Sequence, residues 1–239
     1  MAKPKASTLQ ARFGFLDDDL KTSDHDEIMT WLDSNSKTLL EKITQWQPVW
    51  EKEKVALFQC NAQSAVINQV KEWQTPNSLM SKPNGIDIGK FESWKGLGEP
   101  PVKPPLEIET TWEYTVSGAN KFIVGFIDMK VVVYDSDLNI ENIQYQGYCK
   151  GYMLTHHLHS EQKYSIPSWW IERKAQKRVC YFEVKSTLPS LGELIRQIRM
   201  YQEFLNGSFY VVAPDDKYAQ QLQKQGIGFV KYPEGQISS

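Results

Sequence analysis

The chain has little that would place it in a membrane or in a secreted disulfide framework. Only 3 of its 239 residues are cysteines, and their spacing matches no CxxC metal knuckle, so we expect neither disulfides nor a zinc ribbon. The longest apolar stretch, residues 122–134, is too short to span a bilayer and contains Asp128 and Lys130. The first residues are basic without an apolar core, which is unlike a signal peptide. The sequence therefore predicts a soluble cytoplasmic protein with no membrane partner.

The chain also lacks a strong overall charge, since 27 basic and 29 acidic residues give a formal net charge of −2. A uniformly basic nucleic-acid-binding protein is therefore excluded. The charge is nevertheless uneven, because residues 162–201 carry eight basic against three acidic side chains. A local surplus of this size can hold a polyanion. The candidate nucleic-acid contacts in and beside this segment are Arg173, Lys174, Lys177, Arg178, Arg196 and Arg199.

The apolar content of 41% and the charged content of 23% are those of a globular protein. Helical periodicity predicts helices over 24–46 and 62–73, which together make an N-terminal helical section, residues 1–74. Residues 75–105 are rich in proline and glycine and predict an irregular connection. The remainder, residues 106–239, is predicted to be one core with an insertion at about 135–178.

Strand signals dominate the beginning of this core. Residues 107–116 and 121–134 predict a hairpin, a further strand pair is expected across 140–154, and 179–186 predicts a short strand. Helices and strands then alternate: a helix over 189–205, a strand over 209–213, a helix over 215–224 and a last strand over 228–232. This order predicts an α/β fold with a mixed central sheet and helices on its faces.

Two short motifs place charged residues inside these apolar strands. Asp128 ends the segment Gly125–Asp128, and a carboxylate within a buried strand is costly unless it is paired or bound to a cation. Glu183 and Lys185 are two residues apart, so on a strand they point to the same face. Two carboxylates can hold a divalent cation that activates water, and an ammonium group can stabilise charge on a phosphate. The alternative interpretation is a structural salt bridge at the sheet surface.

A third motif lies on the helix that follows. Gln197 and Tyr201 are four residues apart and therefore neighbours along the edge of the predicted apolar stripe. From that edge an amide and a phenol can reach toward the charged residues or toward a bound strand. The alternative is an ordinary helix flank with a half-buried tyrosine.

In this order, GxhD, ExK and QxxxY (h, an apolar residue) resemble the PD-(D/E)xK nuclease superfamily, specifically its RecB-like branch, over roughly residues 106–230. The resemblance implies a restriction-endonuclease-like αβββαβ core and a Mg²⁺- or Mn²⁺-dependent deoxyribonuclease. It implies that Asp128, Glu183 and the backbone carbonyl of Val184 bind the metal. It further implies that Lys185 is the catalytic lysine and that Gln197 and Tyr201 orient the site and the nucleic-acid strand.

The chain departs from that family in several places. The family usually has an acid on the helix that precedes the first strand. Glu72 is the candidate for it, and Glu107, Glu109 and Glu113 compete with it. The long spacing between Asp128 and Glu183 requires the insertion. The cysteine cluster that holds an iron–sulfur centre in some relatives is absent, so no such cluster is expected.

Two further features have more than one interpretation. His156, His157 and His159 suit a zinc site less well than an exposed polar loop. Trp169 and Trp170 either form a base-stacking platform or cover the core of the insertion. The aromatic residues that would extend this platform are Tyr148, Tyr152 and Tyr164.

The sequence is compatible with three functions. It favours a metal-dependent nuclease acting on DNA. The alternatives are a catalytically silent nucleic-acid-binding relative of the same fold and an interaction protein of a phage or mobile element. The sequence leaves open whether cleavage is endo- or exonucleolytic and which DNA structure is preferred. It also leaves open whether the chain forms a homodimer.

Overall fold

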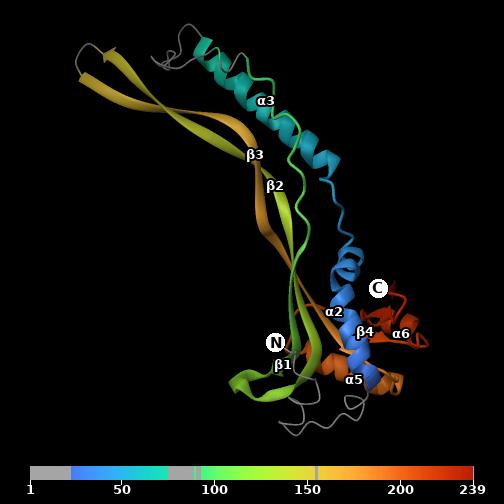
Figure 1. The fold of residues 1–239 in the computed structure, drawn as a ribbon. Helices are drawn as coiled ribbons and strands as arrows, with labels where there is room; N and C mark the ends of the chain where they lie inside the picture. The colour runs from blue at the N-terminus through green and yellow to red at the C-terminus, as the bar shows by residue number, and fades with distance from the viewer. Residues whose placement is uncertain (1–22, 75–88, 90–92, 154–155, 239) are drawn as a thin grey trace. The chain divides into compact units, whose positions relative to one another are not determined.

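The computed structural model describes residues 23–74, 89, 93–153 and 156–238, and it divides the chain into two compact units. The first unit contains the described part of 1–47 together with 105–135 and 174–238, and the second contains the described parts of 48–104 and 136–173. The predicted N-terminal section is thus shared between the units, since its first helix belongs to one and its second helix to the other. Two long strands contribute residues to both units (Figure 1).

The helix α2 spans Ser23–Thr44, as the sequence predicts. Its buried residues recur every three or four positions, which is the pattern of a helix with one apolar face. Leu32 and Leu40 are completely buried, and each such leucine contributes about 2 kcal/mol to stability. Asp24 and Asp26 lie in the first turn, where negative charge complements the helix dipole.

The sheet is mixed and has six strands in the order β1-β2-β3-β4-β5-β6. The antiparallel pairs are β1 with β2 and β5 with β6, whereas β4 lies parallel to both β3 and β5. The α/β class with a mixed sheet is therefore confirmed. The bounds of the strands are β1 Glu107–Ser117, β2 Ile123–Met153, β3 His156–Val184, β4 Ser208–Ala213, β5 Gly228–Lys231 and β6 Gln236–Ser238.

Two strand predictions are wrong. The separate pair expected across 140–154 does not exist, because this segment continues β2, which is 31 residues long. Likewise, the short strand expected over 179–186 is the end of β3, which is 29 residues long. The sequence pattern does not predict β6 at all. Glycines inside 140–154 suggest a turn, but residues 140–153 continue the strand in the structure.

The first unit has three layers, with the sheet in the middle. Side chains of α2 share one buried cluster with alternate residues of the strands, among them Met129, Phe182 and Val212. The helices α5 (Leu191–Gln202) and α6 (Ala219–Lys224) share the second cluster with Tyr181 and Val211. Neighbouring residues of β3 thus face opposite helices, as strand geometry requires.

The α5 helix begins at Leu191, two residues after the predicted start at 189. The Ser190 hydroxyl accepts a hydrogen bond from the Glu193 backbone N–H at 3.3 Å, which satisfies one of the free donors of the first turn. Such a cap is worth about 1 kcal/mol. It fixes the start of the helix that carries Gln197 and Tyr201.

The alternation of β1 and β2 changes at one position. Trp112 and Tyr114 are two residues apart, yet Trp112 packs on the α2 cluster and Tyr114 on the α5 cluster. The same change separates Met129 from Ile127 on β2. Glu113 lies between the two β1 residues and has φ +50°, a left-handed backbone conformation that disrupts the regular pleat. This irregularity falls opposite Asp128.

The second unit contains α3 (Lys52–Gln74) and residues of β2 and β3. The helix begins ten residues before the predicted start at 62, because only Ala62 and Val66 are buried among its described side chains and the apolar signal is weak. Val66 packs with Val70, Trp94 and Ile166. Lys54 of α3 forms an ion pair with Asp137 of β2.

Candidate active site

Asp128 lies in β2 and is 3% exposed. Its Oδ2 accepts a hydrogen bond from the backbone N–H of Val184 on β3 at 2.7 Å. Its Oδ1 lies 3.4 Å from Nε2 of His25, a fully buried residue in the first turn of α2. The carboxylate predicted from the GxhD motif is therefore fixed between a neighbouring strand and a helix.

Glu183 and Lys185 lie at the end of β3, next to Val184. Glu183 Oε1 is 3.1 Å from Lys185 Nζ, and the two residues are 3% and 5% exposed. The Lys185 backbone N–H donates to the Val212 carbonyl at 2.9 Å, which extends the pairing of β3 with β4. The predicted placement of both side chains on one face is confirmed by their contact.

Gln197 and Tyr201 connect α5 to this ion pair. Gln197 Nε2 donates to Glu183 Oε1 at 2.7 Å and to the Tyr201 hydroxyl at 3.2 Å. The Tyr201 hydroxyl in turn donates to the Phe126 carbonyl at 2.8 Å. Burial raises the pKa of Tyr201, and the negative charge of Glu183 adds to this, so the phenol stays protonated and donates. The helix edge thus orients Glu183 through a directed series of hydrogen bonds.

The first residue of the GxhD motif has a packing role. A Cβ atom added at Gly125 would lie 3.0 Å from Cε1 of Tyr201 and 3.3 Å from its hydroxyl oxygen. Tyr201 is buried and hydrogen-bonded at both sides of its hydroxyl, so it has little freedom to move away. A glycine at this position lets the tyrosine of α5 approach β2 closely.

Glu113 introduces a further carboxylate. The register pairs Trp112 with Met129 and Tyr114 with Ile127, so Glu113 falls opposite Asp128. Glu113 is 5% exposed, and neither of its carboxylate oxygens has a hydrogen-bond partner among the described residues. Burial chiefly, with added repulsion from Asp128 and Asp26, raises the pKa of Glu113 from 4.5 to about 7. A buried acid in a strained conformation is unfavourable for folding, which points to a functional reason for it.

The sequence left the upstream acid open, and it did not single out His25. Helical spacing offered a signal for His25, because it shares the buried stripe of Ile28, Met29 and Leu32. Glu113 was one of the competing candidates for this acid, but its burial could not be predicted, since regular alternation places it on the polar side of β1. Glu107 and Glu109, which also lie on β1, form ion pairs with Lys174 instead. Glu72 lies in α3 of the second unit, and its side chain is outside the described residues.

The donor chemistry of this cluster suits a hard cation. Asp128, Glu183 and Glu113 supply carboxylate oxygens, the ligands that Mg²⁺ and Mn²⁺ prefer. The buried carboxylate oxygens of Glu113 lack a hydrogen-bond partner among the described residues. A bound cation would supply the partner that they lack. As the side chains stand, no three His, Cys, Asp or Glu residues of the described part are grouped around one ion position. Binding an ion there requires these carboxylates to move closer together than they stand.

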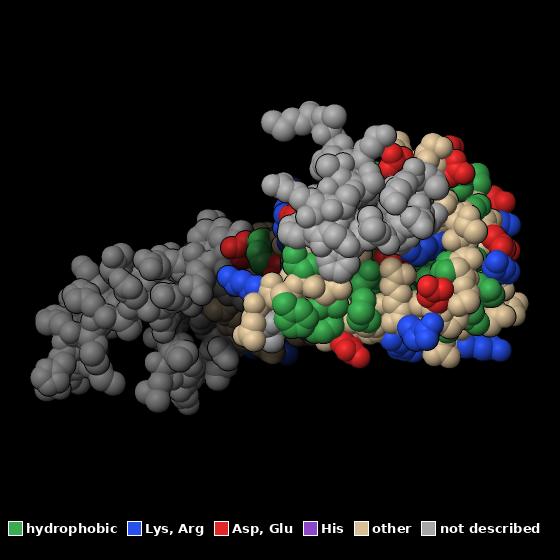
Figure 2. All heavy atoms as spheres, turned by 90° about the horizontal axis from the view of Figure 1, so that it is seen from below, with side chains coloured by type: hydrophobic (Ala, Val, Ile, Leu, Met, Phe, Trp, Pro, Cys, Tyr) green, Lys and Arg blue, Asp and Glu red, His purple; other side chains and the backbone are tan. Residues whose placement is uncertain are grey.

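The predicted nucleic-acid contacts divide into two sets. Lys174 lies 3.4 Å from Glu107, and the Arg199 guanidinium donates to the Gln225 carbonyl at 2.8 Å and to Gln202, so both are bound within the fold. All six side chains are exposed, and Arg178 also donates to the Thr44 carbonyl at 3.4 Å. The described residues provide no such contact for Arg173, Lys177 and Arg196. Figure 2 shows basic and acidic side chains interspersed on the face that it displays. DNA binding by these residues stays a prediction.

Of the two neighbouring tryptophans of the predicted insertion, one is packed within the fold and the other is exposed. The Trp169 indole N–H donates to the Gly98 carbonyl at 3.3 Å, and its ring lies edge-on to Phe58, so Trp169 packs within the second unit. Trp170 is 45% exposed. The side chains of the remaining residues fall outside the description, namely Tyr148, Tyr152, His156, His157, His159 and Tyr164.

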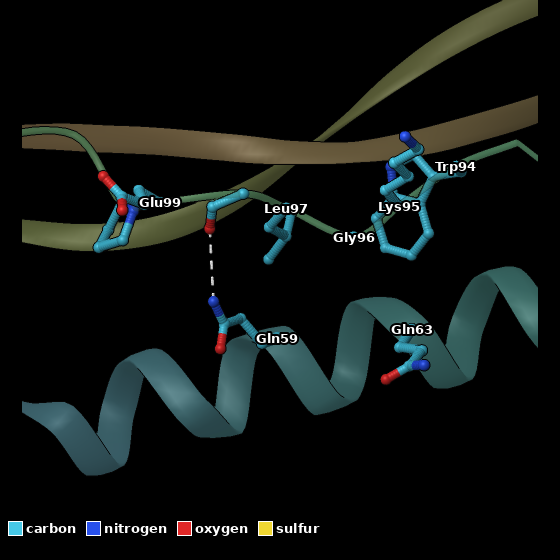
Figure 3. Close-up of a pocket in the computed structure, with 9 residues that line it drawn as sticks. Gln59, Gln63, Trp94, Lys95, Gly96, Leu97 and Glu99 are labelled. Carbon is cyan, nitrogen blue, oxygen red and sulfur yellow. Dashed lines mark hydrogen bonds between the residues drawn. The ribbon is translucent and has the colours of Figure 1, made fainter.

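The second unit also contains a cavity of about 680 Å³ between α3 and the segment 94–100 (Figure 3). Gln59 and Gln63 line it from the helix, and Gln59 Nε2 donates to the Gly98 carbonyl at 3.3 Å. None of its lining residues belongs to the acidic cluster. The cavity is therefore separate in sequence and in composition from the candidate active site.

The comparisons with known proteins add no assignment. Neither the protein-family models, the curated proteins nor the solved structures contain a match to the chain. Within the described ranges, no helix has the length and apolar character needed to cross a bilayer.

Proposed function

We propose that the chain is a metal-dependent deoxyribonuclease whose first unit is a restriction-endonuclease-like core. One observation carries the proposal. Asp128 of β2 accepts a hydrogen bond from the backbone N–H of Val184, the residue between Glu183 and Lys185 on β3. Glu183 and Lys185 form an ion pair, and Gln197 with Tyr201 of α5 is joined to Glu183 by hydrogen bonds. The motifs that suggested the family are far apart in the sequence. Motifs that match by chance would not be expected to lie close together in the fold.

Each side chain of the cluster has a role in this proposal. The carboxylates of Asp128, Glu183 and Glu113 and the carbonyl of Val184 would hold Mg²⁺ or Mn²⁺. When bound, such a cation polarises a phosphate and lowers the pKa of a coordinated water. Gln197 holds Glu183 by its Oε1, and Tyr201 holds Gln197.

Lys185 supplies the one cationic side chain among these residues, within contact distance of Glu183. In this proposal its ammonium group stabilises the negative charge that grows on the phosphate during hydrolysis. The low exposure of Glu183 and Lys185 strengthens this effect, because charges interact more strongly where water is excluded.

The proposal is tested by incubating the purified full chain with single-stranded, duplex and branched DNA in Mg²⁺, Mn²⁺ or EDTA. We expect metal-dependent cleavage that Asp128→Asn reduces at least a hundredfold, because asparagine still accepts the Val184 hydrogen bond but carries no charge. Asp135→Asn on the same strand is the matched control and should cleave as the wild type does. Equal cleavage by Asp128→Asn and the wild type would remove Asp128 from the site.

One observation favours the silent nucleic-acid-binding relative as a second candidate. Asp128 and Glu183 already accept hydrogen bonds from protein donors, and Lys185 neutralises Glu183. Such a cluster can be a purely structural network. The same assay distinguishes the two functions, because the silent relative binds DNA in EDTA and cleaves none in any metal.

A further inference from the structure

Exposed aromatic side chains lie beside the proposed active site. Phe122, the residue just before β2, is 56% exposed, and Phe204, just after α5, is 37% exposed. Their ring centroids are 6.3 Å apart with an interplanar angle of 86°, an edge-to-face pair. Met200, one turn before Phe204, is 36% exposed. Single exposed apolar side chains are ordinary, but a cluster of them marks an interaction surface.

The β1–β2 turn holds Phe122 in this position. Asn120 and Lys121 have φ near +60°, and the Gly118 N–H donates to the Phe122 carbonyl at 2.9 Å. A Cβ atom at Gly118 would lie only 2.4 Å from the Phe122 ring. The ring is therefore folded back over the turn, and a glycine is needed beneath it. Phe122 belongs to neither large buried cluster, so core packing does not explain this arrangement.

The aromatic pair is aligned with the catalytic cluster along α5. Gln197 contacts Glu183, Tyr201 contacts Gly125 and Phe126, and Phe204 contacts Phe122. The C-terminal half of α5 thus runs beside the first residues of β2. The helix rises about 7.5 Å from Gln197 to its last residue, Gln202, and Phe204 follows two residues later. That rise corresponds to about two nucleotides of a stacked strand.

One basic side chain lies next to the pair, a second lies about two turns before Phe204 on α5, and the acidic Glu203 is exposed beside Phe204. Lys121 is the exposed residue next to Phe122 in the turn, and Arg196 is the exposed residue one turn before Met200 on α5. Aromatic faces stack with any unpaired base, and neighbouring cations hold its phosphates. This combination suits a single strand better than a duplex, whose bases are already stacked on one another.

We propose that Phe122 and Phe204 form a stacking site for an unpaired base of the nucleic-acid strand whose phosphate lies at the Asp128–Glu183–Lys185 cluster. This inference rests on the proposed function and deepens it, since it names single-stranded nucleic acid, or the opened end of a duplex, as the preferred substrate.

The test uses the full chain in EDTA, where metal-dependent cleavage is stopped. Binding of a single-stranded oligonucleotide and of a blunt duplex is measured by fluorescence anisotropy, and stacking by quenching of 2-aminopurine placed at successive positions. We expect the double variant Phe122→Leu/Phe204→Leu to bind the single strand about tenfold more weakly and to lose the quenching. Leucine keeps the apolar volume but has no aromatic face.

Two controls define the result. Phe122→Tyr/Phe204→Tyr should retain affinity and quenching, and Leu57→Ala, at an exposed apolar position of α3, should change neither. Unchanged single-strand affinity in the leucine variant would overturn the stacking site. The same applies if Phe122→Ser alters the oligomeric state without altering DNA binding, since the patch would then be an interface between copies of the chain.

The outcomes also separate this inference from the proposed function. If 2-aminopurine quenching depends on the two phenylalanines but no metal supports cleavage, the stacking site is supported and the nuclease proposal is overturned. Metal-dependent cleavage together with unchanged single-strand binding by the leucine variant would support the nuclease and overturn the stacking site. Absence of all nucleic-acid binding would overturn both.

Discussion

Glu113 is the residue that sequence reasoning placed least well and that the structure makes most informative. Its carboxylate is buried opposite Asp128 in a left-handed backbone conformation. Glutamate has no preference for that conformation, and the alternating pattern of β1 assigns it to the polar side. Local rules fail here because burial is imposed by α2 and β2, which contact β1 only in the folded chain.

The raised pKa of Glu113 gives a pH-dependent stability. Its folded-state pKa of about 7 lies above the ordinary 4.5, so the folded chain retains a proton that the unfolded chain releases between these values. Stability is therefore lost as the pH rises from about 4.5 to 7. Glu113→Gln has no titrating carboxylate and therefore lacks this loss. The free energy of unfolding of the variant minus that of the wild type should rise by about 3 kcal/mol between pH 4.5 and pH 8.

The measurement is urea unfolding of both proteins in EDTA across that pH range. Comparing the change with pH, rather than one absolute value, removes the constant cost of burying the glutamine amide. A difference between the two proteins that does not vary with pH would contradict the burial of a titrating carboxylate at this position.

At the scale of elements, the close approach of α5 to β2 is the contact that brings Gln197 and Tyr201 to Glu183. Gly125→Ala should destabilise the fold by about 1–3 kcal/mol, because the added methyl group would overlap the buried Tyr201 ring. Gly192→Ala in α5 is the matched control, since nothing lies within 4 Å of its added Cβ, and there alanine should stabilise the helix slightly. Urea unfolding of both variants measures the effect. Equal stability of Gly125→Ala and the wild type would show that the tyrosine is not held against the strand.

The elements that the sequence predicts well are those with strong local signals. The helix α2 has a clear apolar stripe, α5 has a capping serine, and the β1–β2 hairpin has a turn between two alternating segments. The continuous strands β2 and β3 were not predicted, since their length comes from pairing with each other rather than from local propensity. Asp128, Glu183 and Lys185 could be singled out because charged side chains are unusual inside apolar strands, and their role in a site stays a prediction.

At the scale of the whole molecule, the two units differ in what they carry. The first unit holds the acidic cluster, the α5 network and the aromatic pair, all built from segments far apart in sequence. The second unit holds α3 and the cavity lined by Gln59 and Gln63. This division could not be predicted from the sequence, because each unit is assembled from several separate segments of the chain through long-range contacts. The catalytic proposal concerns the first unit alone.

The most direct test of this proposal removes the buried charge pair as a whole. Lys185→Ala alone leaves Glu183 buried without its cation and should destabilise the fold, which would confuse loss of activity with loss of structure. The double variant Glu183→Gln/Lys185→Met removes both charges together and keeps similar side-chain volumes. Its stability should stay near that of the wild type.

The deciding measurement is the rate of single-stranded DNA cleavage in Mg²⁺ by the wild type and by this double variant, with unfolding curves of both proteins. We expect metal-dependent cleavage by the wild type and at least a thousandfold lower rate in the folded double variant. Cleavage by the folded double variant at the wild-type rate, or wild-type cleavage that persists in EDTA, would contradict a metal-dependent nuclease built on Glu183 and Lys185.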